Sequence, residues 1–66
     1  MTVRYLAQEL YRLTRRVEEL ERALAALGPG TALEERQRLE AELFQARRDR
    51  DETRAVLEAK KEKPLV

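Results

Sequence analysis

The sequence predicts an all-α protein, an antiparallel helical hairpin of two long helices that forms a four-helix bundle when two chains associate. Three observations support this class. Apolar residues recur at alternating intervals of three and four along the first part of the chain, a Gly-Pro-Gly-Thr segment interrupts the pattern, and a second amphipathic stretch follows. Two long helices joined by so short a loop must run antiparallel and pack side by side. All 66 residues are therefore expected to form a single domain.

The first helix is predicted to span about residues 3–27, with Thr2 as its N-cap. Its apolar side chains follow an unbroken heptad repeat, in which valine and leucine alternate at a and leucine occupies every d position. These positions are Val3, Leu6, Leu10, Leu13, Val17, Leu20, Leu24 and Leu27. Because a repeat of about 3.5 residues is shorter than the helical period of about 3.6, the pattern favours a left-handed supercoil.

The turn is predicted at 28–31. Gly28 can close the first helix in the left-handed conformation, the following proline cannot continue a helix, and Gly30 lets the backbone reverse. Thr31 and Glu34 match the S/T-x-x-E capping box, in which each side chain satisfies an amide group of the first helical turn. The capping box places the start of the second helix at about residue 32.

The second helix is predicted to span about residues 32–62 and to be followed by a short tail, 63–66. Its apolar seam is poorer than that of the first helix, because arginines interrupt it. The core positions predicted for this helix are Leu39, Leu43 and Leu57, and Ala32, Ala46 and Thr53 belong to the same stripe. These residues are denser toward the turn, so the half of the hairpin nearer the turn should be the better packed one.

Arg36 and Arg50 fall on a positions of this second seam. A buried, unpaired arginine would destabilise the fold by several kcal/mol. We therefore expect Arg50 to extend toward solvent or to meet a carboxylate such as Glu9 or one from another chain.

Leu33 and Phe44 lie outside the seam, where a lone hairpin would leave them in water. A chain this short buries little apolar surface, and it has no cysteine for disulfides and no histidine for a common zinc site. Self-association is the remaining source of stability, so a homo-oligomer is expected and a dimer is favoured. Leu33 and Phe44 are the candidate face for another subunit or a protein partner. The alternative is a slim two-helix coiled coil that associates only weakly.

The residue types argue against an enzyme. Histidine, cysteine and serine are absent, which removes the usual nucleophiles and bases. Two helices offer no cleft in which a carboxylate would be desolvated, and the two glycines do not form a phosphate-binding loop. No catalytic, cofactor-binding or metal-binding residue is therefore predicted, and no cofactor is expected.

A stripe of arginines on the second helix is the candidate nucleic-acid surface, formed by Arg47, Arg50 and Arg54. The net charge of the chain is only +1, so any such site must be local. Acidic residues four positions further on would pair with neighbouring arginines and reduce their charge: Arg47 with Asp51, Arg48 with Glu52 and Arg54 with Glu58.

The function expected from the sequence is therefore that of a structural or interaction module, a self-associating hairpin that acts as a scaffold or adaptor for protein partners. The alternative is a small RNA-binding helical bundle that uses the arginine stripe. Neither a signal-peptide-like apolar core nor a membrane-length apolar stretch is recognised, so a cytoplasmic protein is expected, without contact to membranes. The excess of arginine over lysine is in the direction seen in proteins of thermophiles or of GC-rich genomes.

Overall fold

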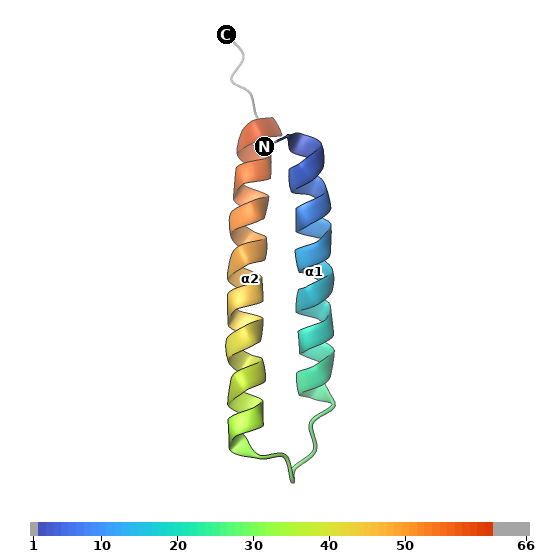
Figure 1. Ribbon diagram of the computed structural model, residues 1–66, viewed down its shortest axis with the longest axis vertical. Helices are drawn as coiled ribbons and strands as arrows, with labels where there is room; N and C mark the ends of the chain where they lie inside the picture. Colours follow the sequence, from blue (N-terminus) through green and yellow to red (C-terminus); the bar gives the residue numbers. More distant parts are fainter. Residues whose placement is uncertain (1, 62–66) are drawn as a thin grey trace.

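The computed structural model describes residues 2–61, and the side chain of the last of these is not described. Within this range the chain forms two helices, α1 (Val3–Ala25) and α2 (Leu33–Lys61). The helices run antiparallel and lie side by side, with the connection at one end and the start of α1 beside the end of α2 at the other (Figure 1). The predicted all-α hairpin is confirmed.

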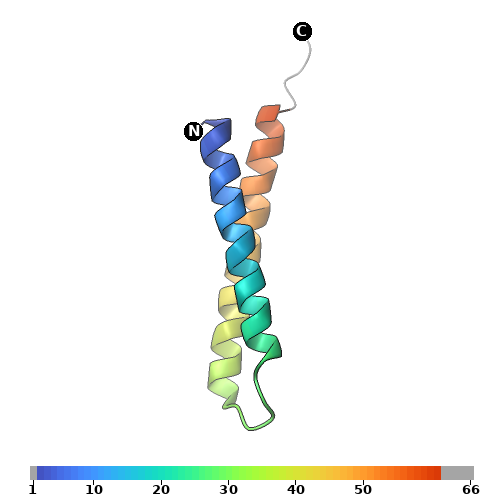
Figure 2. The same cartoon turned by 90° about the vertical axis from the view of Figure 1, so that its right-hand side faces the viewer.

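The two helices cross at a shallow angle. Viewed from the side of α1, that helix runs in front from upper left to lower right, and α2 runs behind it from upper right to lower left (Figure 2). This is the sense of a left-handed crossing, which the heptad repeat of α1 favours. The same seam therefore stays between the helices along most of their length.

Thr2 caps the start of α1. Its backbone is extended, with φ −82° and ψ 157°, and its side-chain oxygen accepts a hydrogen bond of 3.1 Å from the amide of Tyr5. Its carbonyl accepts the first helical bond, 3.0 Å from the amide of Leu6. The hydroxyl thus satisfies an amide that the first turn would otherwise leave unpaired, and the predicted N-cap is confirmed.

The first helix ends earlier than predicted, and without a left-handed glycine. Its C-cap is Ala26, with φ −83° and ψ −9°, and the amide of Leu27 donates to the carbonyl of Leu24 at 3.2 Å in a tighter turn. None of the described residues has a positive φ, so the conformation predicted for Gly28 is wrong. The helix ends at Ala25 because the chain needs several residues to cross from one helix to the other. Gly28 also precedes Pro29, and a residue before a proline favours an extended backbone.

The second helix begins one residue later than predicted, and Thr31 is not its cap. The amide of Thr31 donates to the carbonyl of Gly28 at 3.1 Å, which closes a β-turn with proline at its second position. Ala32 instead occupies the position before the first helical residue, because its carbonyl accepts from the amide of Arg36 at 3.2 Å. Residue 62 and the tail 63–66 lie outside the described residues.

The core lies along the seam and is densest in the half nearer the connection, as expected. Four buried residues form its main cluster, and two half-buried leucines pack against them: Val17, Leu20, Leu43 and Ala46, with Leu24 and Leu39. Two further buried leucines, Leu6 and Leu57, lie toward the open end of the hairpin. The fold is thus a single layer of two helices, with a main apolar cluster toward the connection and two buried leucines toward the open end.

Candidate interaction surface

The hairpin covers only part of its own apolar seam. The predicted core positions that are buried are Leu6, Val17, Leu20, Leu43 and Leu57. Those that are only half-buried are Leu10, Leu13, Leu24, Leu27 and Leu39, while Val3 is exposed. A two-helix layer has solvent on both sides of its seam, so apolar positions beside the line of closest contact keep part of their surface in water.

An ion pair between the helices defines one side of the seam. Arg47 donates to the carboxylate of Glu21 at 2.8 Å, and both residues occupy the heptad e position. The e positions of an antiparallel pair meet on one side of the seam and the g positions on the other. We call the first set the e edge: Ala7, Thr14, Glu21, Leu33, Glu40, Arg47 and Arg54. The g edge consists of Thr2, Glu9, Arg16, Ala23, Glu35, Glu42, Asp49 and Val56.

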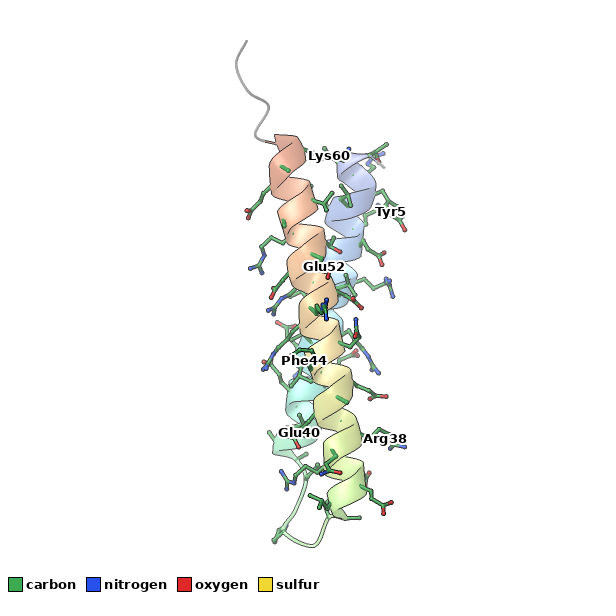
Figure 3. The ribbon with its side chains drawn as sticks, turned by 90° about the vertical axis from the view of Figure 1, so that its left-hand side faces the viewer. Tyr5, Arg38, Glu40, Phe44, Glu52 and Lys60 are labelled. Carbon is green, nitrogen blue, oxygen red and sulfur yellow. The ribbon has the colours of Figure 1, made fainter. Side chains whose placement is uncertain are left out.

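The candidate partner face predicted from the sequence lies along the e edge. Leu33 is 66% exposed and Phe44 is 67% exposed, the largest fractions among the exposed large apolar side chains. Phe44 and Glu40 project from the same edge of α2, opposite Arg38 (Figure 3). Beside them runs a shallow groove with an apolar floor, which is lined by Leu24, Glu40, Leu43, Phe44 and Arg47.

A second groove lies at the open end of the hairpin, beside the g edge. Tyr5 and Val56 are about half exposed and line it together with the buried Leu6. Its rim is acidic, because Glu9 and Glu52 stand on either side. No pattern in the sequence predicts this groove, since Val56 and Tyr5 lie on different helices and neither belongs to the heptad seam.

Two of the three arginines predicted to contact nucleic acid, Arg47 and Arg50, form ion pairs with carboxylates. Arg47 binds Glu21 on the other helix, so its predicted pairing with Asp51 is wrong. Asp51 instead accepts from Arg50 at 3.0 Å. Arg54 is exposed, and it takes part in none of the ion pairs found between described residues. The pair of Arg48 with Glu52, at 3.4 Å, is present as predicted.

Arg50 lies at the seam with its side chain 23% exposed, and its partner is not Glu9. Glu9 binds Arg12 on its own helix, and this hydrogen bond, together with the charge of Glu9, raises the pKa of Arg12 above its ordinary value. Residues three apart on a helix are neighbours, so Arg12 reaches Glu9 more easily than Arg50 does across the seam.

Polar and charged side chains lie at the surface in the part of the chain that the structure describes. The buried residues among those described are all apolar, and no group of three potential metal ligands is found among the described residues. Neither described helix has a stretch long and apolar enough to cross a membrane. What the surface offers chemically is apolar area beside fixed charges.

Comparison with known proteins adds no family. No protein-family model matches this chain, and no curated protein or solved structure is significantly similar to it. The features of the molecule that bear on its function are therefore the e edge and the partly exposed seam.

Proposed function

We propose that this chain is a non-enzymatic interaction module, a helical hairpin that self-associates into a four-helix bundle and serves as a scaffold or adaptor for protein partners. The observation that carries the proposal is the exposure of Leu33 and Phe44 beside a seam that one hairpin leaves half covered. In a four-helix bundle each helix buries a third column of residues next to a and d. Leu33 at position e, together with Phe44 beside this edge, would belong to such a column.

Association would add apolar burial that the hairpin lacks. Burying a leucine or phenylalanine side chain contributes about 1.5 to 3 kcal/mol relative to leaving it exposed. Leu33 and Phe44 are each about two-thirds exposed in the hairpin, and Leu24 beside them is half-buried. A second copy covering this groove would thus contribute stability comparable to the marginal stability of a small domain.

The test is sedimentation equilibrium of the purified chain over about a hundredfold range of concentration, with helix content measured by circular dichroism at each concentration. We expect the mass of two chains at high concentration and a loss of helix on dilution, because folding and assembly are coupled. A fully helical chain with the mass of one subunit throughout would contradict the proposal.

A pair of variants connects this behaviour to the e edge. Phe44→Ser should shift the midpoint of association to higher concentration, since the ring would lose its burial in the dimer. Val56→Ser is the matched control, because Val56 is exposed on the opposite edge. Equal shifts for the two variants would mean that the assembly does not use the Phe44 groove.

A further inference from the structure

The charges of the e edge indicate how a second copy binds. We infer that two hairpins associate through their e edges in opposite directions, turn end against open end, so that Glu40 of each copy pairs with Arg54 of the other. This inference rests on the proposed self-association and adds the surface and the orientation to it.

Charge selects the e edge over the g edge. On the g edge, four carboxylates face a single arginine: Glu9, Glu35, Glu42 and Asp49, with Arg16. Two copies that met there would bring like charges together. The e edge carries two carboxylates and two arginines among its described side chains, and it has the more exposed apolar residues beside it. Opposite charges across an interface fix its register, and like charges exclude alternatives.

The spacing of these charges fits an antiparallel pair of α2 helices. Arg47 lies midway between Glu40 and Arg54, seven residues from each, and all three occupy position e. A twofold axis at the height of Arg47 would therefore place Glu40 of one copy level with Arg54 of the other, once on each side of the axis. The two Arg47 side chains would meet at the axis, where the charge of each is paired with Glu21 of its own chain at 2.8 Å. Within one chain Glu40 and Arg54 are about 21 Å apart along the helix and cannot pair.

The opposite orientation is disfavoured by the same residues. With the two turns at the same end, α2 of each copy would pack against α1 of the other. Among the described residues, the e edge of α1 carries one charged side chain, Glu21, and it is bound to Arg47 of its own chain. In that arrangement Arg54 would therefore meet no free carboxylate of the second copy, and Glu40 would meet no arginine.

Phe44 suits the antiparallel arrangement. It lies three residues before Arg47. In this dimer the two Phe44 rings would therefore be about 9 Å apart along the helix axis, one on each side of the twofold axis. Each ring would then face the second copy instead of solvent. A large aromatic side chain close to the centre of an interface, with charged pairs around it, is the usual arrangement of a strong contact.

Charge reversal tests the orientation. In a Glu40→Arg homodimer both contacts become arginine against arginine, and in an Arg54→Glu homodimer both become glutamate against glutamate. We expect each variant alone to dimerise at least about tenfold more weakly than the wild type. An equimolar mixture of the two should restore wild-type affinity as a heterodimer, because both contacts are then complementary, and so should the double variant E40R/R54E.

The matched controls are Glu42→Arg and Arg48→Glu, which change the net charge equally but lie off the e edge of the same helix. Neither these controls nor their mixture should show the loss or the preference for the heterodimer. Native mass spectrometry with one variant isotopically labelled measures the fraction of heterodimer, and circular dichroism verifies the helix content of each chain.

The outcomes separate the two proposals. If the wild type is monomeric at every concentration, both the proposed function and this inference are wrong. If the wild type dimerises but the Glu40 and Arg54 variants dimerise equally well and mix statistically, the proposed function stands and the orientation inferred here is overturned. A preference for the heterodimer in the control mixture would likewise overturn it.

Discussion

At the scale of single residues, the ends of the helices are formed without special backbone geometry. Gly28 begins the β-turn and Gly30 lies within it, yet neither has a positive φ. A methyl group added at either position would meet no atom within 4 Å. Glycine is therefore not sterically required in the connection, and each glycine adds conformational freedom to the unfolded chain.

We predict that Gly30→Ala raises the free energy of unfolding by about 0.4 to 1 kcal/mol, because alanine reduces the entropy of the unfolded chain without a clash. Urea denaturation at a fixed chain concentration measures the change. Pro29→Ala is the control in the same turn and should have the opposite effect, since it removes a constraint on the unfolded chain. A loss of stability in Gly30→Ala would show that the turn does require glycine.

At the scale of the helices, α1 and α2 contribute differently. The first has a single apolar seam, from which Leu6, Val17 and Leu20 are buried. The second places Arg50 on its seam and carries Leu33 and Phe44 on another side, so its apolar residues face more than one direction. Each helix supplies three of the six buried residues found in the described part of the chain, and α2 additionally carries the exposed apolar side chains of the proposed surface for association.

Two leucine truncations should separate these roles. Leu20 is 3% exposed in the main cluster, so Leu20→Ala should lower the free energy of unfolding by about 2 to 5 kcal/mol at any chain concentration. Leu33→Ala removes a side chain that the hairpin leaves exposed, so its cost should be seen as weaker association. Thermal unfolding at low and high concentration measures both effects. Equal costs at both concentrations for the two variants would contradict this division.

At the scale of the whole molecule, the positions of the charges bear more on the choice of partner than the net charge does. The chain carries a net charge of +1, and ion pairs to Glu21 and Asp51 hold two of the three arginines proposed for nucleic acid. A phosphate backbone would have to compete with these carboxylates. The exposed apolar side chains beside the e edge have no such competitor, which favours a protein partner.

We accordingly predict that the protein does not bind single- or double-stranded RNA at about 0.15 M salt. Fluorescence anisotropy with labelled RNA of both kinds, at low and physiological salt, measures this. The RNA-binding alternative requires binding that weakens steeply with salt and disappears when Arg47, Arg50 and Arg54 are changed to glutamine. That result would replace the interaction module as the function of the arginine stripe.

The sequence by itself determined the helical class, the antiparallel hairpin, the cap at Thr2 and the seam from Leu6 to Leu20, because a heptad repeat and a short loop fix which side of each helix faces the other. Only the tertiary structure decided where the helices end and that Arg47 pairs with Glu21, 26 residues away in the chain. Helix ends depend on the distance that the connection must cross, and a pair between helices depends on their relative height along the seam. Neither quantity is set by the local pattern of residues.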